Sequence, residues 1–299
     1  MSISFGVSPI AWINDDMPEL GGDTPLEQVL AEARDIGFAG IELGGRFPRD
    51  PHTLAALLAR FQLALVGGWY SASLLTRTAR EEIAALQAHL GLVKALGCRV
   101  FILAETSNAI HCDRDRPLSA TPRLDSAAWA RFGAKMTEVA DTVAAAGLRL
   151  AYHHHLGTVV ESREDIDRFL ESTGPSVGLT VDTGHAATAG VDAVSLIREH
   201  PERVAHVHCK DIRGGVFRKI KAEDGSFLHG VLDGMFTVPG DGDLDFRTVM
   251  QALADIGYCG WIIVEAEQNP AIADPRRYGE LGLTTLRREA AAAGLRTAE

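Results

Sequence analysis

The sequence predicts a closed (β/α)8 barrel that forms a single domain over residues 1–299. Short apolar runs alternate with longer amphipathic stretches from one end of the chain to the other, which is typical of parallel strands joined by helices. Eight such units fit within 299 residues, a length that suits a barrel of this kind. The sequence contains no GxGxxG turn, which many open doubly wound sheets carry. The closed barrel is therefore the preferred fold.

The strands are predicted where short apolar runs follow a glycine or a polar turn. A helix is expected after each of them. The eight predicted strands are residues 4–8, 40–43, 63–67, 99–104, 149–153, 178–182, 204–208 and 261–265.

Capping residues and apolar spacing predict the helices. Thr24 is expected to cap the first helix, with Pro25 at its first position and Glu27 completing a capping box. Apolar side chains recur at helical spacing, which favours packing against a sheet. They are Leu26, Val29, Leu30, Ala33 and Ile36 in the first helix, Ile83, Leu86, Leu90, Val93 and Leu96 in the third, and Trp129, Phe132, Met136, Val139 and Val143 in the fourth. Four glycines stand where a left-handed residue ends a helix, namely Gly37, Gly97, Gly147 and Gly257.

Composition restricts the partners and the compartment. The net charge of −11 repels phosphate backbones and anionic lipid surfaces, so we expect neither nucleic acid nor membrane as a partner. The N-terminus has no signal-peptide pattern and no apolar run is long enough to span a bilayer, which predicts a cytoplasmic protein. The four cysteines are widely spaced and are interpreted as reduced thiols. The expected partner is a small molecule, and association into a homo-oligomer is left open.

Metal-ligating residue types end four successive predicted strands. They are His153, Asp182, His208 and Glu265. In a barrel, alternate residues point inward and the C-terminal strand ends meet around the pocket. One such residue alone would have little weight, but four at corresponding points predict a site for a divalent ion such as manganese, cobalt or zinc.

Further polar residues are expected around the same pocket. His155, Lys210 and Glu267 lie two residues beyond predicted ligands on the same strand faces. His185 begins the loop after Asp182 and could orient the substrate. From the first half of the chain, a wall of indole rings and hydrogen-bonding groups would suit a polyhydroxylated ring. Its members are Trp12, Asn14, Asp15, Glu42, Trp69 and Glu105.

Two long connections, residues 106–125 and 211–243, follow predicted strands and are therefore candidate lids over the pocket. Asp245 is expected to cap the helix that comes after the second one.

Several motifs together resemble the myo-inosose-2 dehydratases of inositol catabolism. They include PIAWINDDMPELGGDTPLE, GFAGIELGGRFPRD, GGWYS, YHHHLGTVVES, VDTGHA, HVHCKDIR, FTVPGDGDLDF and GWIIVEAEQNP, and they cover nearly the whole chain. That family is similar in turn to the xylose isomerase-like barrels, which hold one divalent metal. The resemblance implies ligands at Asp182, His208 and Glu265. The wider family usually has glutamate where His153 stands, so the fourth ligand is left open between His153 and His155.

The resemblance implies removal of water from 2-keto-myo-inositol (scyllo-inosose) to give a trihydroxycyclohexane-1,2-dione, with cobalt or manganese and with glutathione as a further cofactor. In that reaction we expect His155 to be the base, and His185 or Lys210 to protonate the departing hydroxyl.

Three other functions are weighed against the dehydratase. A sugar or ketocyclitol isomerase or epimerase on the same scaffold is the nearest alternative, although His153 interrupts the carboxylate pair that such enzymes use. An endonuclease IV-like enzyme would need additional histidines on the early strands and a basic face, which the sequence lacks. A non-catalytic sugar-binding protein would not need the metal ligands.

Overall fold

Eight parallel strands close into a barrel in the computed structural model, which describes residues 2–298. The neighbours around the barrel are β1-β10-β7-β6-β5-β4-β3-β2. These strands are β1 (Ile3–Val7), β2 (Gly40–Leu43), β3 (Ala64–Ala72), β4 (Val100–Glu105), β5 (Arg149–His153), β6 (Val177–Asp182), β7 (Val204–Cys209) and β10 (Gly260–Val264). The predicted fold class is confirmed.

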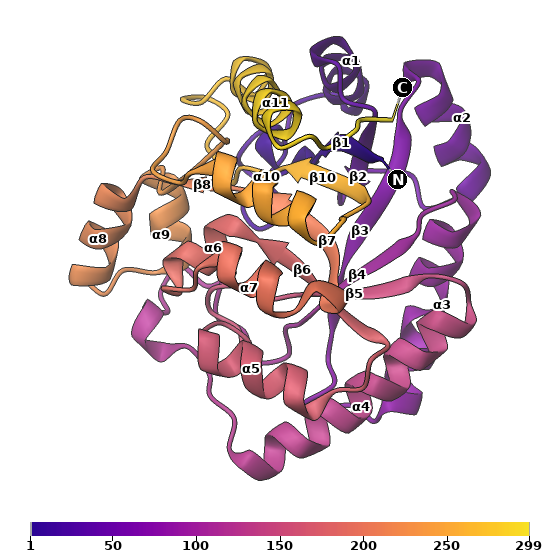
Figure 1. Ribbon diagram of the computed structural model, residues 1–299, viewed down its shortest axis with the longest axis vertical. Coiled ribbons are helices and arrows are strands. Elements are labelled where there is room, and N and C mark those ends of the chain that lie inside the picture. Colours follow the sequence, from indigo (N-terminus) through magenta and orange to yellow (C-terminus); the bar gives the residue numbers. More distant parts are fainter. Residues whose placement is uncertain (1, 299) are drawn as a thin grey trace.

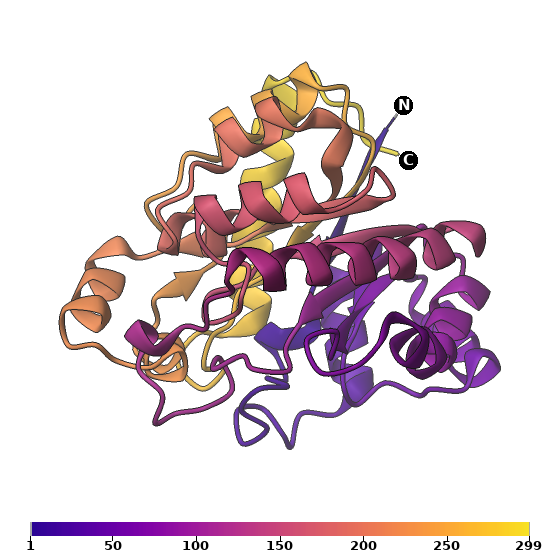
Figure 2. The same ribbon diagram turned by 90° about the horizontal axis from the view of Figure 1, so that it is seen from below.

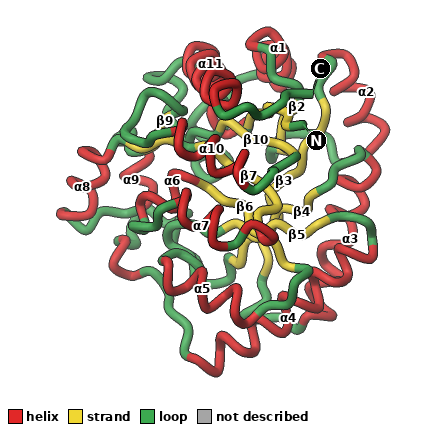
Figure 3. Tube along the Cα trace, in the orientation of Figure 1, coloured by secondary structure: helices red, strands yellow, loops and turns green. Residues whose placement is uncertain are grey.

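Helices surround the barrel, as Figure 3 shows in red around the yellow strands. They are α1 (Leu26–Ile36), α2 (Pro51–Phe61), α3 (Ala79–Ala95), α4 (Ser126–Ala145), α5 (Arg163–Ser172), α6 (Thr183–Thr188), α7 (Ala193–Glu199), α10 (Phe246–Asp255) and α11 (Pro275–Ala292). Short 3-10 turns are η1 (Pro9–Ala11), η2 (Leu118–Ala120) and η3 (Pro201–Arg203). Within residues 2–298, none of the helices is long and apolar enough to cross a membrane. The two ends of the chain lie close together, where Ile3 bridges to Thr297 (Figures 1 and 2).

The predicted strand ends agree with the structure to within one residue, except at the end of β3. We expected that strand to end at residue 67, but it continues to Ala72. Its pairing with β2 shifts register, so that Ile41 pairs with Leu65 whereas Leu43 pairs with Gly68. Gly67 and Gly68 therefore lie at an irregularity inside β3 and do not end the strand.

The residues predicted at helix ends agree with the structure except at the start of α1. Pro25 has ψ 136°, an extended conformation, so it occupies the cap position itself and α1 begins at Leu26 without a side-chain cap. The Thr24 cap and its capping box are therefore wrong. The four glycines predicted to end helices all have positive φ, between 65° and 104°. Asp245 caps α10 as expected, because its side chain accepts a hydrogen bond from the Arg247 N–H.

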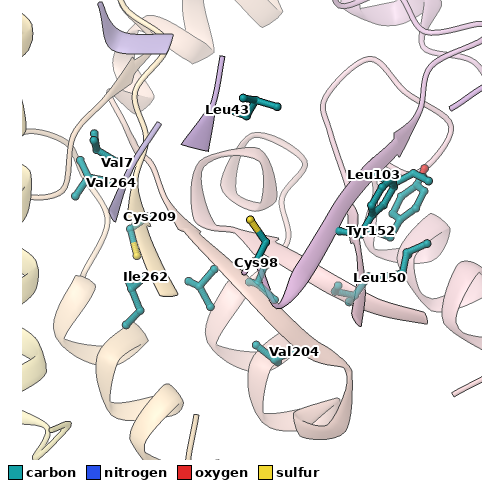
Figure 4. Close-up of a cluster of buried hydrophobic side chains, with 14 of the residues drawn as sticks. Val7, Leu43, Cys98, Leu103, Leu150, Tyr152, Val204, Cys209, Ile262 and Val264 are labelled. Atoms are coloured by element: carbon teal, nitrogen blue, oxygen red, sulfur yellow. The ribbon is translucent and has the colours of Figure 1, made fainter. Parts of the chain in front are cut away.

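Small residues let large ones fill the barrel interior. A Cβ atom on Gly6 would lie 2.8 Å from Ile263 Cδ1, and one on Gly40 would lie 2.7 Å from Val66 Cγ2. Outside the barrel, strand residues pack in a second apolar layer beneath the helices. Figure 4 shows paired residues of this layer side by side, Val7 with Val264 and Leu103 with Tyr152.

The connection after β7 forms a small subdomain of its own, to one side of the barrel in Figure 1. It contains β8 (Asp211–Ile212), α8 (Gly214–Ala222), α9 (Phe227–Leu232) and β9 (Phe236–Thr237). Asp211 anchors it by accepting four backbone hydrogen bonds. The other long connection packs against it, because the Leu118 N–H donates to the Gly225 carbonyl at 3.0 Å. The two candidate lids therefore contact each other, and their movement stays a prediction.

Candidate active site

Four strand ends bring their predicted ligands together. One donor atom each from His153, Asp182, His208 and Glu265 lies within 4.8 Å of the others, and all four residues are buried. His208 Nδ1 lies 3.3 Å from His153 Nε2 and 3.0 Å from Glu265 Oε2. Asp182 Oδ2 lies 3.6 Å from His153 Nε2 and 3.7 Å from His208 Nδ1. Parallel strands deliver these side chains to one end of the barrel, so that residues over a hundred positions apart meet.

This donor group fits a divalent cation. Ligand atoms bonded at about 2.0–2.1 Å to a tetrahedral ion lie about 3.3–3.4 Å apart, which is close to the separations observed. Asp182 Oδ2 is buried and has no hydrogen-bond partner among residues 2–298. Such an unpaired buried carboxylate oxygen is costly unless something positive meets it. His153, Asp182, His208 and Glu265 could therefore hold a metal ion with nitrogen and oxygen ligands.

Glu42 supports the His208 ring from behind. Its Oε1 accepts hydrogen bonds from Nε2 of both His206 and His208, at 2.9 and 3.1 Å. Because Nε2 faces Glu42, Nδ1 is the nitrogen of His208 that faces the donor group, and it would bind a metal ion once deprotonated. Burial opposes ionisation of Glu42, but the charges and hydrogen bonds of His208 and His206 lower its pKa to about 2. Glu42 thus holds the His208 ring in position, and His208 in turn contacts the other donor residues.

Lys210 lies beneath the pocket and not in its wall. Its Nζ lies 2.7 Å from Glu265 Oε1 and 3.7 Å from Asp182 Oδ2, and it also donates to Glu267. It is fully buried and does not line the cavity. Burial lowers the pKa of Lys210, but the three carboxylates outweigh it and raise that pKa, so the ammonium stays charged. The expectation that a substrate could reach Lys210 does not match this position, because the side chain ends under Glu265 and Glu267.

His155 and His185 form a second group with Glu267. The His155 ring lies 5.7 Å from that of His153, measured between centroids, and only 3.8 Å from that of His185. His155 lines the pocket, whereas His185 does not. The structure therefore has His153 in the four-residue donor group and His155 beside it. His185 Nε2 lies 3.0 Å from Lys210 Nζ, in the layer beneath the pocket wall.

The tautomer of His155 follows from its contacts. Its Nδ1 lies 2.8 Å from the Leu156 carbonyl oxygen, to which it can only donate, so Nε2 carries the free lone pair. Burial, with the neighbouring His185 and His111, lowers the pKa of His155 well below its usual range. His155 is therefore a neutral imidazole at neutral pH.

The donor group opens into a pocket of about 360 Å³. Of the residues predicted from sequence, eight line it: Asp15, Glu42, Trp69, His153, His155, His208, Glu265 and Glu267. Trp69 is 36% exposed, and its ring meets that of His153 edge-on at 5.2 Å. The pocket thus combines acidic side chains, imidazoles and one indole face, which suits a polyhydroxylated ring.

Three predicted wall residues do not reach the pocket. Trp12 turns toward α1, where its indole N–H donates to Glu32 Oε2 at 2.7 Å. Asn14 folds back to accept the backbone N–H groups of the next turn, at 2.8 and 2.9 Å. Glu105 faces away because Ile102, three residues earlier on β4, faces the barrel interior, and side chains alternate along a strand. It accepts hydrogen bonds from Leu74 and Ser107 instead.

Four of the polar residues near this pocket that sequence reasoning missed lie outside the barrel strands. Asp16, His111 and Arg49 line it, and Cys112 lies beside Asp16. All four lie in loops or just before a helix, so no strand period identifies them. The one signal was the position of His111 and Cys112 inside a long connection at the C-terminal side of a strand.

Comparison with known proteins gives consistent relatives. A family model described as the xylose isomerase-like TIM barrel matches residues 30–287. The inosose dehydratase of Geobacillus thermodenitrificans is 40% identical over 92% of this chain and 93% of its own length. The rhizopine catabolism protein MocC of Rhizobium meliloti is 47% identical over 99% of this chain and 91% of its own.

Among solved structures, an L-ribulose 3-epimerase superposes with a TM-score of 0.67 at 19% identity, over 100% of both chains. A D-psicose 3-epimerase from Clostridium cellulolyticum gives 0.68 at 16% identity, over 96% of this chain and 99% of that one. At these identities the likeness extends to the fold alone. The family model and the sequence relatives establish more than the fold. The chain belongs to the xylose isomerase-like TIM barrel family and, within it, to the family of the inosose dehydratases.

Proposed function

We propose that this chain is a metal-dependent dehydratase that removes water from 2-keto-myo-inositol (scyllo-inosose) to give a trihydroxycyclohexane-1,2-dione. The observation that carries this proposal is the neutral His155 in the pocket wall, directly beside a buried donor group of two histidines and two carboxylates. The inosose dehydratases at 36–40% identity support the same reaction.

The proposed metal ligands are His153, Asp182, His208 and Glu265, with manganese or cobalt as the expected ion and zinc as a further possibility. A bound divalent cation would polarise the substrate ketone and so acidify the neighbouring C–H bond. The protein contributes the rigid donor set, the Glu42 support of His208 and the exclusion of water by a buried pocket floor.

His155 is the proposed base. Its Nε2 has the free lone pair, and its depressed pKa keeps it unprotonated, so it can accept the proton next to the ketone. The C–H electron pair then forms the carbon–carbon double bond as the bond to the β-hydroxyl breaks. The leaving oxygen needs a proton to depart as water.

Glu267 is the group through which that proton would arrive. It lines the pocket, whereas Lys210 and His185, the acids expected from sequence, lie behind it. Burial raises the pKa of Glu267 above its usual value, and its Oε2 has no hydrogen-bond partner among residues 2–298. Lys210 donates a hydrogen bond to its other oxygen, which also lies 3.5 Å from His185 Nε2. We therefore assign Lys210 to charge balance and His185 to the packing behind Glu267, and Glu267 to contact with the substrate.

The test is product mass. Incubated with scyllo-inosose and manganese or cobalt, the protein should yield a product lighter by one water with new ultraviolet absorbance. His155→Gln should slow this reaction and keep its metal, whereas Asp182→Ala should lose the metal and the activity together. A product of unchanged mass would overturn the dehydratase and favour the epimerase alternative.

Rhizopine catabolism is a second candidate setting, because the 47% identical relative carries that name. Turnover of rhizopine-derived cyclitols in preference to scyllo-inosose would favour it.

A further inference from the structure

Three side chains outside the four-residue donor group meet at the rim of the pocket. Asp16 lies in the connection before α1, and His111 and Cys112 lie in the connection between β4 and η2. One oxygen, one nitrogen and the sulfur lie within 4.8 Å of one another. The Cys112 thiol donates to Asp16 Oδ1 at 3.3 Å. For a tetrahedral ion with bonds of about 2.0 Å to oxygen and about 2.3 Å to sulfur, the expected oxygen–sulfur separation is about 3.5 Å.

The turns that carry these ligand atoms are already held in place. The Asp16 N–H donates to Asn14 Oδ1 at 2.9 Å. The Ile110 N–H donates to the connection after β5 at 2.9 Å. An ion pair between Arg114 and Glu19 joins the two connections. Little reorganisation is therefore needed for the three groups to bind one ion.

One nitrogen of the buried His111 imidazole has no hydrogen-bond partner in the described part of the chain. The side chain is only 6% exposed, and its Nδ1 is buried without a hydrogen-bond partner among residues 2–298. A buried ring nitrogen left unpaired in this way costs free energy that a ligand would recover.

The charges around the pocket also favour a second cation. Five carboxylates line it, namely Asp15, Asp16, Glu42, Glu265 and Glu267, and Asp182 lies directly beneath. Against these six stand two permanent cations, Arg49 in the wall and Lys210 beneath. Carboxylates therefore outnumber the permanent cations around this pocket, which favours the binding of cations.

We propose that Asp16, His111 and Cys112 bind a second divalent cation, of the zinc class, at the rim of the pocket. Carboxylate, imidazole and thiolate are the ligands that zinc accepts together, whereas a thiolate is a poor ligand for magnesium or calcium. Binding forms a metal–sulfur bond and breaks the thiol S–H bond, and the proton leaves to solvent. A fourth position remains for water or a substrate hydroxyl, because Asp16 and His111 both line the pocket. This site does not depend on the proposed dehydratase reaction.

Cadmium titration of the metal-free protein tests the proposal, because a cadmium–thiolate bond absorbs in the ultraviolet. The wild-type chain should bind two Cd²⁺ and gain this absorbance with one of them. Cys112→Ser should bind one ion and gain no absorbance, and His111→Gln should bind the second ion at least tenfold more weakly. Asp182→Asn should keep the thiolate absorbance and lose the other ion. Cys259→Ser is the matched control, since it removes the other exposed cysteine and should change nothing.

Two results would overturn the second site. One is a wild-type protein that binds a single Cd²⁺ without thiolate absorbance. The other is absorbance that persists in Cys112→Ser and disappears in Cys259→Ser, which would mean ordinary surface-thiol binding. Neither result bears on loss of water from scyllo-inosose, so a failure of this site can be distinguished from a failure of the proposed reaction.

Discussion

Glu42→Gln should weaken metal binding without touching a ligand. The substitution keeps the size of the side chain but removes the negative charge that accepts hydrogen bonds from His206 and His208. Both imidazoles donate to the same oxygen, Oε1, so glutamine can keep these contacts only as a neutral and weaker acceptor. The His208 ring then loses part of its orientation and its basicity.

The magnitude follows from the distance between Glu42 and the donor group. The 3.1 Å hydrogen bond to His208 Nε2, the width of the ring and a bond of about 2.1 Å to the ion together give about 7 Å. Over that distance a unit charge and a divalent ion attract by about 1 kcal/mol in water and about 5 kcal/mol at an effective dielectric constant of 20. Loss of a group in this position typically costs 10- to 100-fold in metal affinity, or about 1.4–2.7 kcal/mol, which falls between these limits.

The assay is competition for manganese or cobalt between the protein and a chelator of known affinity. Glu105→Gln is the matched control, because Glu105 is equally buried on a barrel strand but faces away from the pocket. It should lower stability and leave metal affinity unchanged. A Glu42→Gln protein that is folded and binds metal within twofold of the wild type would refute the reasoning.

Three further outcomes are expected. Lys210→Met leaves three buried carboxylates without their cation, so the free energy of unfolding, measured in urea, should fall by about 3–5 kcal/mol. Turnover of the folded fraction should fall about a hundredfold, and wild-type turnover would contradict the assigned role. Gly6→Ala forces a Cβ against Ile263 and should cost about 1–3 kcal/mol, whereas Gly91→Ala, in open space within α3, should stabilise by about 0.5–1 kcal/mol. Burial lowers the pKa of His89 below 6.5, so its contribution to stability is complete above pH 6.5 and is lost as the pH falls toward the folded-state value. His89→Asn should therefore flatten the decline in the free energy of unfolding below pH 6.5. A His89→Asn protein with the pH dependence of the wild type would contradict this role of His89.

Much of the fold follows from local sequence. Each strand was recognisable as a short apolar run, and the four glycines predicted to end helices have positive φ for a reason contained in a few residues. The four-residue donor group was predictable because ligand-type residues stand at equivalent strand ends, and parallel strands in a closed barrel must bring those ends together. Local periodicity and barrel closure are sufficient for both inferences.

Contacts between distant segments decided the remaining features. Alternation along β4 turned Glu105 outward, and a loop carried Trp12 to Glu32 and away from the pocket. The sequence predicted His153 as a ligand, but the resemblance left the fourth ligand open between His153 and His155, because the wider family usually has glutamate where His153 stands. Only the approach of β6 and β7 places His153 beside Asp182 and His208. The cluster of Asp16, His111 and Cys112 joins two loops about a hundred residues apart, and no periodicity relates them, because loop positions are fixed by tertiary contacts and not by a local repeat.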